Sequence, residues 1–228
     1  MGKTITIAID GPAGAGKSTL ARRLASRLGF LYIDTGAMYR AVALWARNLG
    51  IAWDDARRLE QLARESRIEL GPGGRVRLNE EDVTEAIRDP EISEGASRVS
   101  AFAGVRRALV EKQQQFGRQA SVVMEGRDIG TVVFPQAEVK IFLDATPEER
   151  TRRRLKDLAA RGIRADFAEV LAEIERRDQR DSTRADSPLC QAPDAIYVDS
   201  TGMNEDEVEE ALLKIVRERT SNGKELNS

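Results

Sequence analysis

The eight residues Gly11-Pro12-Ala13-Gly14-Ala15-Gly16-Lys17-Ser18 decide the fold of this chain. They match the pattern G-x-x-x-x-G-K-[ST] in full, directly after a strand-like run, Thr4–Asp10, and directly before a helical pattern, Lys17–Leu28. In that setting the glycines let successive backbone N–H groups point at one anion, and the helix dipole adds to the attraction. Lys17 would reach the β- and γ-phosphates of a nucleotide, and the Ser18 hydroxyl would help to hold Mg²⁺. The stretch therefore predicts a nucleoside triphosphate site.

Four further runs share the character of this first strand, because they are rich in β-branched residues, apolar on both faces and separated by helical patterns. The five predicted strands are Thr4–Asp10, Phe30–Asp34, Ser121–Glu125, Val139–Asp144 and Ala195–Asp199. We expect an α/β fold with a parallel sheet, whose ligand crevice lies at the carboxyl ends of the strands. Every predicted strand ends there on a carboxylate, which can hold a metal or orient a loop, or can simply cap the next helix.

Helical patterns fill most of the gaps between these strands. They cover Lys17–Leu28, Ala37–Asn48, Asp54–Ser66, Gly104–Gln119, Pro147–Arg161, Phe167–Asp178 and Glu205–Arg219. One segment breaks the alternation, because Ile68–Leu70 and Val76–Leu78 flank a Gly-Pro-Gly-Gly turn and predict a two-stranded hairpin. We therefore divide the chain into a core of residues 1–66 and 89–219, a small β insertion at 67–88 that leans on the core, and a flexible polar tail at 220–228.

The composition excludes several kinds of chemistry. The 228 residues include no histidine and one cysteine, Cys190, which rules out imidazole bases, His-ligated zinc and intrachain disulfides. A net charge of −2 argues against binding to nucleic acid or to an anionic membrane through overall charge. No apolar run reaches the roughly 20 residues of a membrane span, and no signal-peptide pattern is present. We expect a cytoplasmic protein and, since no heptads are visible, a monomer.

Arginine dominates the cations, with 29 Arg and 7 Lys among the 36 basic residues. This bias can reflect a GC-rich or heat-adapted source, or it can reflect phosphate sites, because the guanidinium fork matches phosphate oxygens. Position separates the two explanations. Four arginines lie within the nine residues Arg176–Arg184, alternating with Asp and Ser/Thr. A run of this kind is often a solvated helix face, but here we interpret it as a loop-like, mobile lid that covers about residues 161–188.

Triphosphate binding alone leaves several functions open. No N-K-x-D guanine motif is present, and Asp199–Gly202 lies too near the C-terminus to be a GTPase switch loop. The chain is also short for a motor ATPase. A small-molecule kinase needs a second anion site, and segments that contain arginine follow the second and third predicted strands at Asp34–Arg40 and Glu125–Asp128. These segments are candidates for the acceptor site.

Four segments, in this order and spacing, resemble those of the bacterial cytidylate kinases: Gly11–Thr19, Asp34–Arg40, Glu125–Pro135 and Arg177–Arg184. The segment Glu125–Pro135 is far more specific than the phosphate loop, which many families share. The resemblance covers about residues 4–217. It implies a P-loop kinase fold, in which helices wrap a five-stranded parallel sheet, and transfer of the γ-phosphoryl group of ATP to CMP, with dCMP as a second acceptor. The β insertion falls where this family enlarges its monophosphate-binding region.

The resemblance also implies roles for residues at matching positions. On the donor side, ATP would be bound by Gly11, Pro12, Ala13, Gly14, Ala15, Gly16, Lys17, Ser18, Thr19 and Arg153. Arg152 and Arg154 flank Arg153, so it stays open which of these three arginines matches the family's nucleotide-side arginine. Mg²⁺ would be held through Ser18, with Glu125 near it. Position 125 is Asp in some relatives, so the Glu125 side chain is longer than theirs by one methylene group and its carboxylate can lie at a different distance from Mg²⁺.

On the acceptor side, the resemblance implies that CMP is bound by Thr35, Tyr39, Arg40, Ser97, Arg106, Arg127, Asp128, Arg177, Asp181 and Arg184. Thr35, Ser97 and Asp128 would contact cytosine, and Thr35 stands where many relatives carry Ser. Arg106 and Arg127 would clamp the CMP phosphate, and Asp181 would contact the sugar hydroxyls. Lys17, Arg127, Arg177 and Arg184 would act in catalysis.

Phosphoryl transfer between two nucleotides suits a protein without histidine. A monophosphate acceptor is already anionic at pH 7, so transfer needs alignment and charge stabilisation rather than a strong general base. We expect direct in-line transfer without a phosphoenzyme. Two other hypotheses stay open: a P-loop kinase for another small acceptor, and a nucleotide-dependent regulatory protein whose Arg-rich segments grip a partner.

Overall fold

The computed structural model describes residues 4–221, and its centre is a five-stranded sheet in the order β2-β6-β1-β7-β8. All neighbouring strands run parallel, so the predicted parallel sheet is confirmed. Four of the strands begin one or two residues later than the sequence predicts. The bounds are β1 (Thr6–Asp10), β2 (Leu31–Asp34), β6 (Val122–Gly126), β7 (Val139–Asp144) and β8 (Ile196–Asp199).

The strand order places β1 between β6 and β7, so the chain moves to one side of β1 for β2 and to the other side for β8. In open parallel sheets, such a reversal opens a crevice at the carboxyl ends of the strands. The phosphate loop follows β1 and therefore lies at this crevice. The segments after β2 and β6 emerge at the same edge, which brings the donor and acceptor candidates together.

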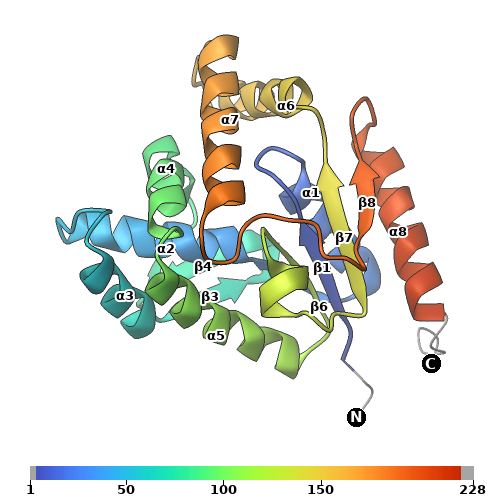
Figure 1. Cartoon of the computed structure of the whole chain (residues 1–228), viewed down its shortest axis with the longest axis horizontal. Helices are drawn as coiled ribbons and strands as arrows, with labels where there is room; N and C mark the ends of the chain where they lie inside the picture. The colour runs from blue at the N-terminus through green and yellow to red at the C-terminus, as the bar shows by residue number, and fades with distance from the viewer. Residues whose placement is uncertain (1–3, 222–228) are drawn as a thin grey trace.

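Helices cover both faces of the sheet, and a group of them extends beyond it (Figure 1). Figure 1 shows α1 and α8 beside the parallel sheet, α2–α5 gathered with the small β-sheet on the other side, and α6 and α7 at the top. The helix α2 begins at Thr35 instead of Ala37, because the Asp34 carboxylate caps it by accepting the Ala37 N–H at 2.9 Å. The helices are α1 (Lys17–Leu28), α2 (Thr35–Asn48), α3 (Ala56–Glu65), α4 (Pro90–Val99), α5 (Ala103–Gln119), α6 (Pro147–Ala160), α7 (Phe167–Thr183) and α8 (Glu205–Ser221).

The insertion forms a three-stranded antiparallel sheet rather than the predicted two-stranded hairpin. Its strands are β3 (Ile68–Gly71), β4 (Arg75–Leu78) and a short β5 (Glu81–Asp82), with the turn η1 (Pro72–Gly74) between the first two. Val76 and Leu78 belong to one apolar core with residues of α2, α3, α4 and α5. The insertion is therefore fixed to the helices α2–α5 by burial of its apolar face.

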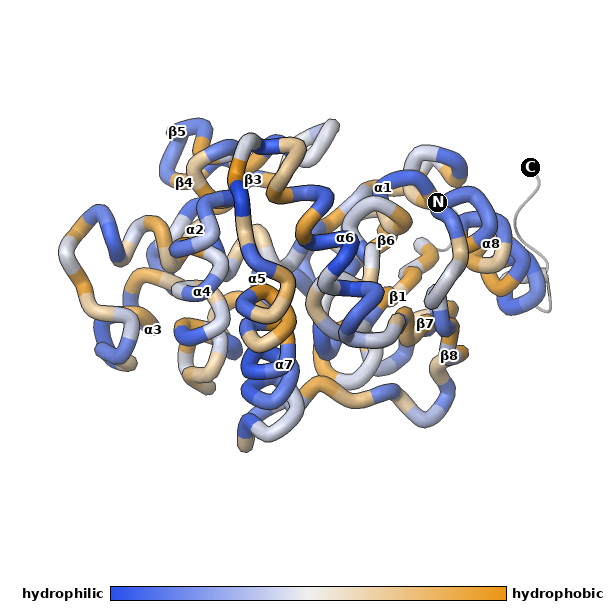
Figure 2. Tube along the Cα trace, turned by 90° about the horizontal axis from the view of Figure 1, so that it is seen from above, coloured by the Kyte–Doolittle hydropathy of each residue, from blue (hydrophilic) through white to orange (hydrophobic). Residues whose placement is uncertain are grey.

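The predicted loop-like character of Arg176–Arg184 is wrong, because α7 continues as a helix to Thr183. Asp166 caps its start by accepting the N–H groups of Ala168 and Glu169. Figure 2 shows α7 mostly in hydrophilic colours, whereas β1 is largely hydrophobic. The pair α6–α7 has a small apolar cluster of its own, formed by Leu158, Val170 and Ile174.

The C-terminal boundary also differs from the prediction. Thr220 is buried at the end of α8, and its hydroxyl donates to the Val216 carbonyl at 2.6 Å, so a tail that starts at Thr220 begins too early. The rest of the predicted tail, from residue 222, lies outside the described residues. Within residues 4–221, the helices are too short or too polar for any of them to cross a lipid bilayer.

Candidate active site

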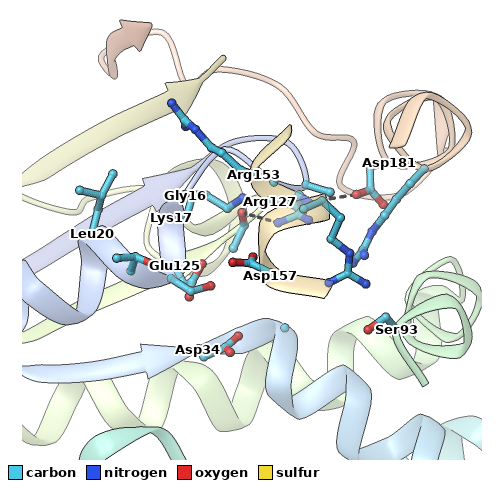
Figure 3. Close-up of a pocket in the computed structure, with 18 of the residues that line it drawn as sticks. Gly16, Lys17, Leu20, Asp34, Ser93, Glu125, Arg127, Arg153, Asp157 and Asp181 are labelled. Atoms are coloured by element: carbon cyan, nitrogen blue, oxygen red, sulfur yellow. Dashed lines mark hydrogen bonds and ion pairs between the residues drawn. The ribbon is translucent and has the colours of Figure 1, made fainter. Parts of the chain in front are cut away.

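A cavity of about 740 Å³ lies at the carboxyl edge of the sheet, between the phosphate loop, α2, α4 and α7. Lys17 and Ser18 line it from α1, Thr35 and Arg40 from α2, and Arg177 from α7. Figure 3 shows Lys17 and Glu125 in this region, and Arg127 reaching towards Asp181. The structure thus brings the predicted donor and acceptor segments around one space.

The phosphate loop begins with a glycine that the packing requires. A Cβ at Gly11, whose φ is 150°, would lie 1.9 Å from the Leu143 carbonyl oxygen of β7, so the loop can leave the sheet here only with glycine. Lys17 is buried, and its ammonium donates to the Pro12 carbonyl at 2.6 Å. Burial, and then the charge of Arg127, lower the pKa of Lys17 to about 7. A phosphate bound in the loop would restore the charge of Lys17.

Two arginines of α6 hold the outer side of the phosphate loop. Arg153 donates to the Ala15 carbonyl at 3.3 Å and to the Ser200 carbonyl at 2.7 Å, and it lines the cavity. Arg150, which the sequence analysis missed, is buried and donates to the Ala13 carbonyl at 3.1 Å. Since three more arginines follow in the helix, sequence alone offers no means to single out the one that supports the loop.

The donor end of the cavity continues past the phosphate loop to the segment after β8. Met203, Asn204, Glu205 and Val208 line it there. The sequence analysis missed these residues because they form no motif. Their one signal is position, since they follow the last strand at the carboxyl edge where ligands bind.

The carboxylates at the strand ends separate into two kinds. Asp10 accepts the N–H groups of Ile129 at 2.8 Å and Gly130 at 2.7 Å, and so it fixes the segment after β6. Burial raises the pKa of Asp10 to about 6. Glu125 is also buried but faces the cavity, and burial together with the nearby Asp34 raises the pKa of its carboxyl. Glu125 is therefore a strand-end acid that is available to a ligand near the phosphate loop, and Asp34 lines the same cavity.

Glu125 also organises its neighbours. The Tyr32 hydroxyl donates to its Oε1 at 2.6 Å, and the Thr35 hydroxyl donates to its backbone carbonyl at 2.7 Å. Arg40 donates to Asp34 at 2.8 Å, and although burial opposes ionisation of Asp34, Arg40 and the helix N–H groups hold its pKa below the usual value. These contacts fix the edge of the cavity between β2 and β6.

The acceptor wall contains a buried ion pair between Arg106 of α5 and Asp128. The Arg106 guanidinium lies 5.8 Å from the centre of the Tyr39 ring and also donates to the Ser100 carbonyl at 3.4 Å. Ser97 is placed less directly: it is buried with a hydroxyl that has no hydrogen-bond partner, but it is not among the cavity-lining residues, whereas Ser93, Ala96 and Ser100 of the same region are.

The helix α7 closes the cavity with a row of charged side chains. Arg127 donates to Asp181 at 3.0 Å, and Arg184 lies 3.8 Å from the same carboxylate. Burial opposes ionisation of Asp181, but Arg127, Arg177 and Arg184 keep its pKa low. Burial, and then the charge of Arg127, lower the pKa of Arg177 to about 10, so this guanidinium still carries its charge at pH 7.

Several of these guanidinium groups have N–H donors to spare. Buried nitrogens without a hydrogen-bond partner occur on Arg40 (Nε), Arg106 (Nε), Arg177 (Nε) and Arg184 (Nη2). An unsatisfied buried donor costs free energy, so four of them at one cavity indicate a site built for an anionic ligand. Arg180, one of the four arginines of the Arg176–Arg184 run, instead forms a bidentate ion pair with Glu94 of α4, with both distances 2.8 Å.

The comparison with known proteins agrees with this geometry. Residues 7–218 match the family model for cytidylate kinase. The chain belongs to the cytidylate kinase family. It is 61% identical over 227 residues to a cytidylate kinase of Solibacter usitatus, which covers 99% of this chain and 97% of the relative. It is 52% identical to a cytidylate kinase of Syntrophotalea carbinolica, with 96% and 94% covered.

These findings confirm the resemblance to the cytidylate kinases that the sequence indicates. Among solved structures, an uncharacterized protein from Eubacterium ventriosum covers 95% of this chain and 99% of its own, with a TM-score of 0.55 and 13% identity. A likeness at that identity shows a shared fold alone. Membership of the cytidylate kinase family therefore rests on the family model and on the close relatives.

Proposed function

We propose that this protein transfers the γ-phosphoryl group of ATP to CMP, and also to dCMP, giving ADP and the corresponding diphosphate. The observation that carries the proposal is a single cavity with a phosphate loop at one side and spare guanidinium donors at the other. A phosphotransferase between two nucleotides needs this arrangement, because it must hold two anions within reach of each other. The family membership and the names of the close relatives support CMP as the acceptor.

On the donor side, the phosphate loop and Lys17 would hold the triphosphate, and Arg153 would support the loop from outside. Mg²⁺ fits the oxygen donors that face this region, the Ser18 hydroxyl and the Glu125 carboxylate. Residues 4–221 contain no group of three or more His, Cys, Asp and Glu side chains arranged to hold a metal. When bound in this region, Mg²⁺ would help to neutralise the charge that develops on the transferred phosphoryl group.

On the acceptor side, Arg106 and Arg127 would bind the CMP phosphate from the α5 and β6 sides, and Arg177 and Arg184 would approach it from α7. Asp128, Thr35 and Ser97 would contact cytosine, with Tyr39 and Arg40 beside them, and Asp181 would contact the sugar. Asp128 and Asp181 are both buried and already paired with arginines, and Arg127, Arg177 and Arg184 keep the pKa of Asp181 low. The site would need only small changes of partner when the acceptor enters.

Transfer would proceed in line, directly from donor to acceptor. The acceptor phosphate is a ready nucleophile, so Lys17, Arg127, Arg177 and Arg184 would act by alignment and by stabilising charge on the moving phosphoryl group. No side chain needs to carry the phosphoryl group. Incubation with ATP labelled at the γ-phosphate should therefore label no protein in the absence of CMP, and a stable phosphoprotein would contradict direct transfer.

The deciding experiment is a coupled assay of ADP formation with CMP, dCMP, UMP, AMP and GMP as acceptors. We expect CMP and dCMP to give the highest kcat/KM. Preference for a different acceptor would identify another small-molecule kinase. Slow ATP hydrolysis that none of the acceptors accelerates would instead favour a nucleotide-dependent regulatory protein.

The proposal extends to the organisation and setting of the protein. The core would comprise residues 1–66 and 89–219, and the insertion at 67–88 would serve the monophosphate side. Residues 161–188, which contain α7, would act as the lid, and the separate apolar cluster that α7 forms with Leu158 of α6 supports this assignment. We also propose a cytoplasmic monomer that uses neither nucleic acid nor a membrane. The exposed, unpaired Cys190 supports a reducing compartment.

A further inference from the structure

The carboxylate of Glu125 is held from a neighbouring strand. Glu125 is 4% exposed at the end of β6, and its Oε1 accepts the hydroxyl proton of Tyr32 at 2.6 Å. The Ser18 hydroxyl, at the start of α1, is a second hydrogen-bond partner of the carboxylate. Lys17 lies beside it (Figure 3). One carboxylate therefore connects β2, through Tyr32, to the last two residues of the phosphate loop.

The register of the sheet explains how Tyr32 reaches Glu125. β2 and β6 are parallel, with Tyr32 opposite Val123 and Asp34 opposite Glu125. Side chains two residues apart on a strand share a face, so Tyr32 and Glu125 are diagonal neighbours. A diagonal separation of about 7–8 Å is within reach of an aromatic and a long side chain, but not of two short ones. Both the ring of Tyr32 and the length of Glu125 are needed for this contact.

The tyrosine ring is held in turn by the β insertion. The Arg22 guanidinium lies over the Tyr32 ring, 5.4 Å from its centre. The turn of the insertion lies against the same arginine, since a Cβ at Gly74 would be 3.2 Å from Arg22 Nη2. The ring is therefore placed between the sheet and Arg22, and its hydroxyl is directed at the carboxylate.

We propose that Tyr32 is a positioning residue for the metal side of the reaction. Its hydroxyl holds Oε1 of Glu125 and so orients this carboxylate, which also interacts with Ser18, for a nucleotide-bound cation. Glutamate has one more rotatable bond than aspartate, so without this donor its carboxylate would have to be ordered at the moment of binding, at an entropic cost. The inference rests on the proposed function, because that function assigns Glu125 to the cation.

The test is the coupling between Mg²⁺ and ADP binding, measured by titration calorimetry as the ratio of the ADP dissociation constants without and with Mg²⁺. Tyr32→Phe keeps the ring under Arg22 and removes only the hydroxyl. We expect it to reduce the ratio by about tenfold or more, as for loss of a hydrogen bond to a charged group, while the metal-free dissociation constant stays within about twofold. Tyr197→Phe is the matched control, because Tyr197 is an exposed tyrosine of β8, and it should leave the ratio unchanged.

A double-mutant cycle then shows whether Tyr32 acts through Glu125. Glu125→Gln alone should reduce the ratio, and adding Tyr32→Phe to it should change the ratio no further. Glu125→Asp provides a second variant should Tyr32→Phe not fold, since the shortened carboxylate can no longer meet the hydroxyl and should give the same loss. The inference is overturned if Tyr32→Phe leaves the ratio within twofold of wild type, if it weakens ADP equally with and without Mg²⁺, or if the two effects multiply in the double variant.

The outcome also separates this inference from the proposed function. If the wild-type protein fails to phosphorylate CMP or dCMP but the cycle behaves as expected, the acceptor assignment is wrong and the role of Tyr32 stands. If CMP is phosphorylated but Glu125→Gln leaves the ratio unchanged, the kinase activity stands. In that case Glu125 has no part on the metal side, and the role of Tyr32 is refuted with it.

Discussion

Nucleotide binding should be accompanied by proton uptake at Lys17. This ammonium is buried beside Arg127 and Arg177, and burial is the largest cause that lowers its pKa to about 7. A bound polyphosphate would place several negative charges beside the same group and raise its pKa again. The bound state then holds more protons than the free state, so affinity for Mg²⁺–ADP should fall as pH rises above about 7.

The size of the effect follows from the pKa. With a free-state pKa of about 7, roughly 90% of the Lys17 side chains are neutral at pH 8 and roughly 10% at pH 6. We therefore expect uptake of about 0.9 proton per ADP bound at pH 8 and about 0.1 at pH 6. An ordinary lysine, with a pKa near 10.4, would give almost none at either pH. At pH 8 the phosphates of ADP contribute little, because a phosphate monoester has its second pKa near 6.

Titration calorimetry in buffers of different ionisation enthalpy measures this uptake directly, since the slope of the observed enthalpy against the buffer enthalpy counts protons. Lys17→Ala should abolish the slope at pH 8 and should lower kcat for CMP by at least two orders of magnitude. Lys214→Ala is the control, because Lys214 is an exposed lysine of α8, with 77% of its side chain accessible. This variant should keep both the slope and the activity.

A slope below about 0.2 for the wild-type protein at pH 8 would refute the reasoning, because Lys17 would then be charged before the nucleotide arrives. A full slope that survives in Lys17→Ala would assign the proton to another group. A loss of activity below tenfold in this variant would contradict a role of Lys17 on the transferred phosphate.

Three further predictions concern the acceptor wall, α6–α7 and the sheet. Arg106→Ala should raise the KM for CMP at least tenfold with little change in the KM for ATP, and equal changes in both values would contradict the assignment of Arg106 to the acceptor. The same variant should lower the free energy of unfolding by about 3–5 kcal/mol, because Asp128 is left buried and unpaired. Trypsin cleavage within residues 161–184 should slow when both nucleotides are bound, and an unchanged rate would count against lid closure. Asp10 has a folded pKa of about 6 against 3.8 for the free side chain, so the folded state binds more protons between these values and stability falls as pH rises through that window. Compared with Asp10→Asn, the wild-type protein should therefore gain about 2 kcal/mol on going from pH 7 to pH 4 in urea unfolding, and a pH-independent difference would contradict the raised pKa.

The donor half of the site could be predicted from sequence because its determinants are contiguous. The phosphate loop lies in one segment, and its glycines are required by local geometry, as at Gly11 against the Leu143 carbonyl. The parallel strands could also be predicted, since buried strands leave continuous apolar runs. Their starts were misplaced by one or two residues because the hydrogen-bonded register, and not composition, sets where pairing begins.

The acceptor half depends on packing between segments that are distant in the chain. The resemblance named Arg106 and Asp128, but not that they form a pair, which follows from how α5 packs beside the segment after β6. The same applies to Tyr32, whose hydroxyl contacts an acid 93 residues away. Met203 and Val208 line the cavity but belong to no sequence motif. Only the order of the strands in the sheet, which places the end of β8 at the same edge, brings them there.

The arginine run at the end of α7 shows how a single error in secondary structure changes a functional assignment. If the run were a loop, the sequence would not show which of its arginines contact the phosphate. As a helix of 3.6 residues per turn, it places Arg177 and Asp181, four residues apart, on one face, and Arg184 follows directly after its last residue; all three line the cavity. Arg180 has a similar spacing to Arg177 and Arg184, but it pairs with Glu94 of α4 instead of lining the cavity. If this element opens, it must do so as a rigid helix, so that the three cavity-facing side chains withdraw together and the Arg180–Glu94 pair breaks in the same movement.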